Sequence, residues 1–288
     1  MPTSLNALLA AAPPYPRRVV CLTEETTEIL YRIGAGALVA GVSGFTVRPP
    51  EARQKPRVSS FLSADLARIR ALRPDLVLGF SDLQAPLAAD LARQGLPVFV
   101  LNQRSVAEIL QTIRVVAALV GRAEAGQALA GELERGLERV ADRAAALPRR
   151  PRGFFEEWPD PLIAGIRWVS ELLELCGGED VCAECRSEQG ARGRIFAPEV
   201  VAARDPEFVV ASWCGRKAVR ARIASRAGWA GVRAVLDDQL YEVKSTLILQ
   251  PGPAALSDGL GELERIVAAV ARGERLPARR AGELRRAS

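Results

Sequence analysis

The sequence has 288 residues, of which 49% are hydrophobic and 25% charged, a balance that excludes fibrous and disordered proteins and provides for two hydrophobic cores. It contains no histidine, which removes the commonest general base and the commonest zinc ligand and argues against most hydrolases. Most of the net charge of +5 lies at the end of the sequence, in Arg275–Ser288, and no other basic patch is interleaved with aromatic residues. We therefore expect a solvated tail and no nucleic-acid partner.

Two features of the sequence bear on the cellular compartment. The five cysteines are an odd number at scattered positions, which is not the pattern of a disulfide framework and favours a reducing compartment. Met1–Pro14 carries no lysine or arginine before its short apolar run, unlike a secretory signal, and no run is long enough to span a membrane. We predict a cytoplasmic monomer without membrane insertion. A periplasmic protein is the alternative if the gene start has been assigned wrongly.

Strands alternate with helices along the first half of the sequence. Short β-branched or apolar runs predict strands over 18–22, 38–42, 76–79 and 97–101. Helical spacing of apolar residues predicts helices over 28–34, 64–72, 85–93 and 105–120. This alternation indicates a mainly parallel sheet that is covered by helices on both faces.

A long helical pattern separates two similar halves. The apolar residues of 125–147 fall on one stripe over about six turns. The helix that ends at Gly34 recurs as a helix that ends at Gly177, and the strand after Pro74 recurs after Pro206. The predicted fold class is therefore α/β, with two Rossmann-like lobes that have mainly parallel sheets, one long joining helix and a ligand cleft between the lobes. The predicted domains are an extension (1–17), an N-terminal lobe (18–122), a linking helix (123–150), a C-terminal lobe (151–273) and a basic tail (274–288).

Ligands of open parallel sheets bind beyond the carboxyl ends of the strands, so the residues that follow each predicted strand are site candidates. Glu24 and Glu25 follow the first strand, and Glu156 and Glu157 follow its equivalent in the second half. Four carboxylates would converge on one cleft, where they accept hydrogen bonds from an amide-rich ligand or bind a cation. Alternatively, one acid of each pair caps the helix that follows. The same argument adds Phe45, Phe80, Asp82, Gln103, Trp158, Lys244 and Gln250 as ligand-binding candidates.

An aromatic residue, a thiol and two cations follow the buried strand 207–212. Trp213 suits stacking against a large planar ligand. Cys214 stands next to Arg216 and Lys217, which would depress its pKa and make it a candidate ligand of a soft metal such as cobalt. Alternatively, Trp213 packs in the interior and Cys214 is a small buried hydrophobic residue. No other metal ligand and no catalytic residue is predicted.

Cys182 and Cys185, with Cys176 nearby, have the spacing of half a zinc or redox site. No second pair and no histidine exist to complete four ligands, so unrelated thiols are the alternative. The segment Leu247–Pro253 indicates a rigid loop in which Gly252 allows close backbone approach. No glycine-rich nucleotide-binding motif follows a strand.

Several segments carry a family pattern, namely Arg48–Ala52, Lys55–Val58, Ala64–Leu78, Leu172–Val181 and Pro198–Pro206. Together they resemble the periplasmic-binding family for vitamin B12 and iron siderophores, and the cobalamin-binding subgroup is the nearest by motif. The resemblance covers nearly the whole chain. Members have two Rossmann-like lobes bridged by one rigid helix, with the ligand in the cleft.

The resemblance implies a non-enzymatic binding protein that captures a cobalamin-like corrinoid and uses no catalytic cofactor. It also implies an ABC permease as partner, docking at Glu199, although the corresponding acid of the first lobe is Ala67 here. Glu24 and Glu25 stand where the family has small residues and proline. With the missing signal, these departures favour a cytoplasmic carrier over a periplasmic shuttle.

Two alternative functions remain open. An iron-siderophore or other metal-chelate binding protein would favour a cationic site over four acids. A thiol-based metal or redox protein would use Cys214, together with Cys182 and Cys185.

Overall fold

The computed structural model describes residues 14–277, which divide into two compact units. The first unit holds the described residues up to Arg135 together with Gln250–Leu256, which we call the return segment. The second unit holds Gly136–Leu249 and the residues from Ser257 onward. No helix within 14–277 is both long and apolar enough to cross a membrane. The predicted extension 1–17 and basic tail 274–288 lie largely outside the described residues.

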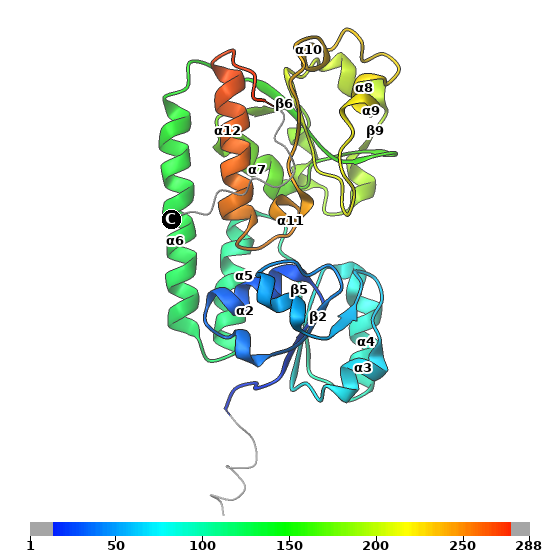
Figure 1. Cartoon of the computed structure of the whole chain (residues 1–288), viewed down its shortest axis with the longest axis vertical. Coiled ribbons are helices and arrows are strands. Elements are labelled where there is room, and N and C mark those ends of the chain that lie inside the picture. Colours follow the sequence, from blue (N-terminus) through cyan, green and yellow to red (C-terminus); the bar gives the residue numbers. More distant parts are fainter. Residues whose placement is uncertain (1–13, 278–288) are drawn as a thin grey trace, which may run out of the picture. The chain divides into compact units, whose positions relative to one another are not determined.

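The first unit is a doubly wound parallel sheet. Its strand order is β3-β2-β1-β4-β5, and every neighbouring pair is parallel. In Figure 1, α3 and α4 lie on the opposite side of these strands from α2 and α5. The strands are β1 (Val19–Cys21), β2 (Val39–Ser43), β3 (Arg57–Ser59), β4 (Leu76–Phe80) and β5 (Val98–Leu101). The helices are α2 (Glu24–Arg32), α3 (Leu66–Ala71), α4 (Ala85–Arg93), α5 (Val106–Leu119) and the first part of α6 (Ala123–Ala145), with 3₁₀ turns η1 (Gly36–Leu38), η2 (Pro50–Gln54) and η3 (Asp82–Gln84).

Local sequence explains where these elements begin and end. A capping box starts α5, because the Ser105 hydroxyl accepts a hydrogen bond from the Glu108 amide while the Glu108 carboxylate accepts one from the Ser105 amide. Gly34 ends the α2 region with a φ of +73°, and its repeat Gly177 follows α7 with a φ of +88°. Strands β1 and β4 are buried along their whole length, as expected for central strands covered on both faces.

The second unit has a mixed sheet. Strands β10 and β11 are parallel to each other and to β6, as is β8, whereas β7 is antiparallel to both β6 and β9. The strands are β6 (Arg152–Pro159), β7 (Leu162–Ala164), β8 (Glu179–Asp180), β9 (Ile195–Phe196), β10 (Phe208–Ala211) and β11 (Leu240–Glu242). The helices are the rest of α6, α7 (Arg167–Leu175), α8 (Pro198–Ala203), α9 (Arg220–Ala224), α10 (Arg233–Leu236), α11 (Ser245–Ile248) and α12 (Leu260–Ala271), with η4 (Ala183–Ser187) and η5 (Ala191–Arg194). The π-helical turn η6 (Ala255–Gly259) begins in the return segment and ends in the second unit.

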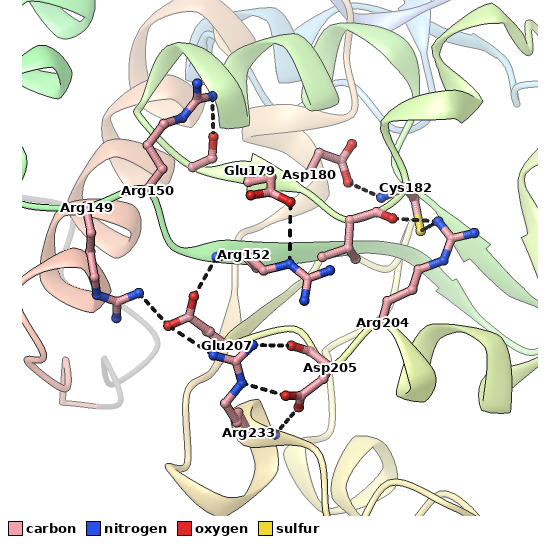
Figure 2. A network of polar contacts seen from close by, with 12 residues as sticks. Arg149, Arg150, Arg152, Glu179, Asp180, Cys182, Arg204, Asp205, Glu207 and Arg233 are labelled. Atoms are coloured by element: carbon pink, nitrogen blue, oxygen red, sulfur yellow. Dashed lines mark hydrogen bonds and ion pairs between the residues drawn. The ribbon is translucent and has the colours of Figure 1, made fainter.

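Ion pairs hold the amino edge of this second sheet together. Figure 2 shows Glu207, which precedes β10, accepting from the Arg149 guanidinium at 2.5 Å and from the Arg152 amide at 3.0 Å. Arg233 donates to Asp205 at 2.6 Å, and hydrogen bonds from Arg233, led by its backbone amide, lower the pKa of Asp205. Arg149 and Arg233 at this edge thus lie against carboxylates, whereas Arg150 donates to the Gly178 carbonyl.

The observed fold confirms the predicted class. Two of the strands, β6 and β3, differ from the prediction. We predicted that Glu156, Glu157 and Trp158 follow a strand, whereas they lie within β6. Strand β6 is longer than expected because it continues past β10 and pairs with the antiparallel β7, a partner that the repeat pattern does not contain. The short strand β3 was also not predicted, since its three residues are too few to show a period.

Candidate functional site

Exposed apolar side chains gather at the carboxyl edge of the first sheet. Phe45 follows β2, Leu62 follows β3 and Leu83 follows β4, and their exposed fractions are 52%, 66% and 58%. Because the carboxyl ends of parallel strands lie at one edge of a sheet, these three side chains are placed along the same edge, and we call them the apolar rim. Large apolar groups that cluster on a surface mark a binding site.

One cation stands beside this apolar rim. The Arg104 guanidinium lies 5.0 Å from the ring centroid of Phe80, which is itself buried. It also donates to Asp82 and Asn102, each at 2.9 Å. A hydrogen bond from Ser81 and the nearby Arg104 charge lower the pKa of Asp82. The predicted candidates Phe80 and Asp82 therefore come together at one edge around Arg104.

The acids after β1 are not presented at this edge but buried under the return segment. Gln250 donates to the Glu24 carboxylate at 3.3 Å, and the Ala254 amide donates to Glu28 at 3.3 Å. A Cβ atom at Gly252 would lie 2.6 Å from that of Glu25, so only glycine fits there. The predicted candidate Gln103 is also buried, and its amide donates to the Pro251 carbonyl at 3.0 Å.

Glu25 is the most strongly perturbed of these acids. Its side chain is 1% exposed, it accepts a hydrogen bond from the Thr23 hydroxyl at 2.5 Å, and its Oε2 atom has no partner within the described residues. Burial raises the pKa of Glu25 to about 8, and the neighbouring charges of Glu24 and Glu28 add to the effect. Burial also raises the pKa values of Glu24 and Glu28. Glu25 is a neutral structural acid at pH 7.

In the second unit, Glu156 is an internal counter-ion. It is fully buried, and its two carboxylate oxygens accept from Arg226 at 2.6 and 2.7 Å and from the Trp213 indole at 2.9 Å. Trp213 is only 3% exposed and belongs to the core of this unit. Its buried ring has no open face on which a ligand could stack, so we do not propose Trp213 as a ligand contact.

Glu157 and Trp158 are partly buried near the end of β6. The carboxylate of Glu157 accepts from the buried guanidinium of Arg194 at 2.5 Å. The face of Trp158 is covered by Arg216, whose guanidinium lies 5.1 Å from the ring centroid. Trp158 is therefore the tryptophan that remains at this edge of the second sheet, and a cation already stacks on it.

Three cations at the carboxyl edge of the second sheet form what we call the basic cluster, Arg216, Lys217 and Lys244. Arg216 and Lys217 follow β10, Lys244 follows β11, and these two strands are neighbours in the sheet. All three residues are exposed. Cys214 in the same loop is exposed as well, so it is not the buried hydrophobic residue of the alternative interpretation.

The remaining cysteines are buried thiols. Burial raises the pKa of Cys185 to about 11 and that of Cys182 further, so neither is an accessible thiolate at neutral pH. No group of three histidine, cysteine or acidic side chains within 14–277 is arranged to hold a metal ion. The half-site suggested by Cys182 and Cys185 therefore has no further ligands in the described part of the chain.

Glu199, the predicted docking residue, lies in the first turn of α8 and is exposed. It borders a surface pocket of about 440 Å³ that also includes Asp205 and Val232. A carboxylate in that position is free to meet a cation of a partner, and its role remains a prediction.

Sequence reasoning did not select the residues that neutralise the predicted acids. Arg194 and Arg226 lie far from Glu157 and Glu156 in sequence, and nothing in their local patterns indicates these ion pairs. Leu83 was also missed, although it follows the predicted strand 76–79 and could have been found by the rule that selected Phe45. Leu62 follows β3, which was not predicted, so the same rule could not find it.

The two α/β units of the fold agree with a comparison of sequences. Residues 19–247 match the family described as Periplasmic binding protein. This chain belongs to that family. The known relatives of this periplasmic binding protein are binding proteins and not enzymes.

Named relatives cover most of the chain. The vitamin B12-binding protein of Yersinia pestis (strain Pestoides F) is 30% identical over 213 residues, which are 72% of this chain and 74% of the relative. The vitamin B12-binding protein of Vibrio cholerae serotype O1 (strain ATCC 39541) is 26% identical over 254 residues, which are 85% of this chain and 87% of the relative. The cobalamin-binding subgroup that the motifs indicated is thus represented among the relatives.

Solved structures show the same fold. The periplasmic vitamin B12 binding protein of Vibrio cholerae superposes with a TM-score of 0.73 at 24% identity, covering 90% of this chain and 99% of that one. A periplasmic heme binding protein of Pseudomonas aeruginosa gives a TM-score of 0.78 at 22% identity, covering 91% and 96%. At these identities the likeness concerns the fold.

The family corrects the predicted location. We predicted a cytoplasmic protein from Met1–Pro14 and from the odd number of cysteines, and this prediction was wrong, because the family and its named relatives are periplasmic. The cysteine argument fails for a physical reason. Four of the five thiols are buried, and a buried thiol is protected from oxidation in any compartment.

Proposed function

We propose that this protein is the substrate-binding component of an ABC-type uptake system and that its ligand is a cobalamin-like corrinoid. The observation that carries the proposal is the apolar rim of Phe45, Leu62 and Leu83 at the carboxyl edge of the first sheet. A corrin macrocycle offers a broad apolar surface that such a rim covers, and covering it removes all three side chains from water. The names of the relatives support the same ligand.

The polar candidates divide by exposure. In the first unit, Asp82 and Gln250 retain some access to solvent and are the groups available to hydrogen-bond the amide side chains of a corrinoid. Glu25 in the first unit and Glu156 in the second are buried and internally bonded, so we assign them structural roles and no ligand contact. A redox or metal function of Cys182 and Cys185 has little support, because burial raises the pKa values of both thiols. Among the described cysteines, this leaves the exposed Cys214 as the candidate for a thiol-based function.

The test is an absorbance titration of the purified protein with hydroxocobalamin and with cobinamide, combined with thermal unfolding. A ligand that binds only the folded state raises the melting temperature by mass action, to an extent that depends on its concentration. We expect saturable binding and a rise in melting temperature with at least one of the two compounds. Replacement of Phe45 and Leu83 by serine should weaken that binding without unfolding the protein, since both side chains are exposed. The absence of a response to both compounds would refute the proposal.

A matched control separates the rim from general surface hydrophobicity. Leu236 is 66% exposed and lies in α10 of the second unit, away from the strand ends, so Leu236→Ser changes an equally exposed leucine. We expect wild-type affinity from this variant. An equal loss of affinity in the rim and control variants would contradict a ligand site at the rim.

A further inference from the structure

We infer that the first unit binds the surface of an anionic lipid bilayer through a group of arginines on and beside α3. We call this group the basic face, and its members are Arg18, Arg57, Arg68, Arg70 and Arg73. All five residues are exposed. The binding is peripheral, because it uses lipid phosphate groups and places no part of the chain inside the bilayer. The inference concerns where the protein is held and not which ligand it carries, so it is independent of the proposed function.

The first argument is the concentration of positive charge in one segment. Residues 53–73 contain six cations and a single acid, Asp65. Asp65 accepts a hydrogen bond from the Arg68 backbone amide at 2.9 Å, which does not neutralise its charge. When Asp65 and the flanking Glu51 and Asp75 are all counted, residues 51–75 carry six cations against three acids. The segment therefore keeps a positive excess after all of its acids are included.

The second argument is that contacts bring these cations onto neighbouring elements. The Asp65 amide, just before α3, donates to the Val58 carbonyl of the edge strand β3 at 2.8 Å. At the other end of α3, the Arg18 guanidinium donates to the Leu72 carbonyl at 2.8 Å. Helix α3 thus extends from β3, which carries Arg57, to the residues that precede β1.

Helix α3 presents arginines on its outer side. Its inner side packs on the core of the sheet through Ile69, which is fully buried. With about 100° of rotation per residue, Ala67 and Ala71 lie opposite Ile69, and Arg68 and Arg70 lie on the two flanks of these alanines. All four of these residues are exposed. The outer surface of α3 is therefore two long cations on either side of small residues.

The third argument is that these arginines lack counter-ions in a protein that usually pairs its arginines. The ion pairs of the first unit involve other arginines, and no carboxylate within 14–277 pairs with a member of the basic face. In the second unit, Glu207 accepts from the Arg149 guanidinium, as Figure 2 shows. Its counterpart Asp75 accepts instead from the backbone amides of Arg17 and Arg18, at 2.7 and 2.8 Å. Like charges that share a surface repel one another, so an anionic partner stabilises such a face.

The residues between the arginines favour a lipid surface over a protein partner. Stable protein interfaces have large apolar or aromatic side chains at their centre. No large hydrophobic residue within 48–61 or 63–82 is exposed, and the outer side of α3 offers only Ala67 and Ala71. An anionic bilayer needs no such anchor, because each cation near its surface contributes separately to the attraction. Adsorption of this kind would keep the protein close to a partner embedded in the membrane.

The experiment measures co-sedimentation of the full-length protein with lipid vesicles. The vesicles consist of phosphatidylcholine alone or of equal parts of phosphatidylcholine and phosphatidylglycerol, in about 0.02 M or about 0.5 M salt. The basic-face variant carries Arg57→Gln, Arg68→Gln and Arg70→Gln. The control variant removes the same charge from exposed positions of the second unit and carries Arg139→Gln, Arg192→Gln and Arg272→Gln.

A third variant tests the basic tail, which lies outside the described residues. It carries Arg279→Gln, Arg280→Gln, Arg285→Gln and Arg286→Gln. Circular dichroism and a titration with hydroxocobalamin, carried out on every variant, report whether the fold and the ligand site are intact.

We expect the wild type to bind the vesicles that contain phosphatidylglycerol and not those of phosphatidylcholine alone. Binding should be largely lost at about 0.5 M salt, because salt screens the attraction between exposed charges. The basic-face variant should bind about tenfold more weakly or less, since three cations no longer contribute. The control variant should bind as the wild type does, and all variants should respond to hydroxocobalamin as the wild type does.

Three results would overturn the inference. The first is a wild type that does not bind the anionic vesicles or binds phosphatidylcholine equally well. The second is equal binding by the basic-face and control variants, and the third is a loss of binding that occurs only in the tail variant. None of these results bears on the corrinoid proposal. Conversely, a protein that binds the anionic vesicles through the basic face but responds to no corrinoid would refute the proposed function alone.

Discussion

Replacement of Glu25 by glutamine should make the first unit more stable at alkaline pH and leave it nearly unchanged at acidic pH. Glutamine has the same shape and can keep the hydrogen bond with the Thr23 hydroxyl, but it has no proton to lose. The wild-type side chain is 1% exposed and faces the return segment, with Glu24 and Glu28 as neighbouring acids and Arg48 as the cation on Glu28. Ionisation of Glu25 in this place is costly because it puts a further negative charge into an enclosed acidic cluster.

The magnitude follows from the difference in pKa between the folded and unfolded states. The folded protein holds the Glu25 proton up to a pH of about 8, whereas the unfolded chain releases it near 4.5. Between these two pH values the unfolded state binds fewer protons, so the free energy of unfolding of the wild type falls as the pH rises. The loss is complete above the folded pKa and amounts to roughly 3 to 5 kcal/mol, which Glu25→Gln should abolish.

The assay has to report on the first unit. All four tryptophans lie in the second unit, so urea unfolding should be followed by circular dichroism and by amide hydrogen exchange of the peptides that contain α2 and the return segment. Measurements at about pH 5 and about pH 9 bracket the transition. The control is Glu51→Gln, which removes an exposed acid from the same unit and should not alter the pH dependence. A Glu25→Gln variant whose stability falls with pH as steeply as that of the wild type would refute the reasoning.

Three further predictions follow from contacts described above. Gly252→Ala should destabilise the first unit by about 1 to 3 kcal/mol in urea unfolding, because the added Cβ atom would lie 2.6 Å from the Cβ atom of Glu25. The control is Gly261→Ala in α12, which should be neutral or stabilising because its Cβ atom meets nothing within 4 Å. Arg226→Met should destabilise the second unit by about 3 to 5 kcal/mol in unfolding followed by tryptophan fluorescence, because it leaves the Glu156 charge buried and unpaired. The double variant with Glu156→Gln should regain part of the lost stability. Glu199→Lys should reduce uptake through the permease, while the ligand affinity of the purified protein stays unchanged. Normal uptake by this variant would exclude docking at this carboxylate.

The sequence allowed prediction of the elements that local patterns determine. Helix α4 was predicted with its observed bounds, and the recurrence of Gly34 as Gly177 correctly marked two helix ends at which the backbone has positive φ. Central strands such as β4 were found because continuous burial leaves a continuous apolar run. In each case the information lies within a few residues of the element itself.

The candidate site was harder to predict because burial of polar groups depends on distant partners. The rule that ligands bind at strand ends selects the loops that contain Asp82 and Lys244, but it treats all side chains of a loop alike. It could not show that Glu156 points inward, since its partner Arg226 comes from a helix–loop region 70 positions later. Whether an acid after a strand faces ligand or core is decided by tertiary packing, which no local pattern records.

The return segment has a consequence for how the chain folds as it is synthesised. Gln250–Leu256 belongs to the first unit, while the residues on both sides of it belong to the second. Until those residues leave the ribosome, the three acids at the start of α2 lack the backbone that covers them, so the first unit cannot finish folding when its own sheet is complete. Its last contacts are long-range in sequence, which slows folding, and the two units must mature together. A gene divided after α6 would therefore yield an N-terminal fragment in which Glu24, Glu25 and Glu28 lack their contacts with the return segment, and a peptide corresponding to that segment supplied in trans should bind there.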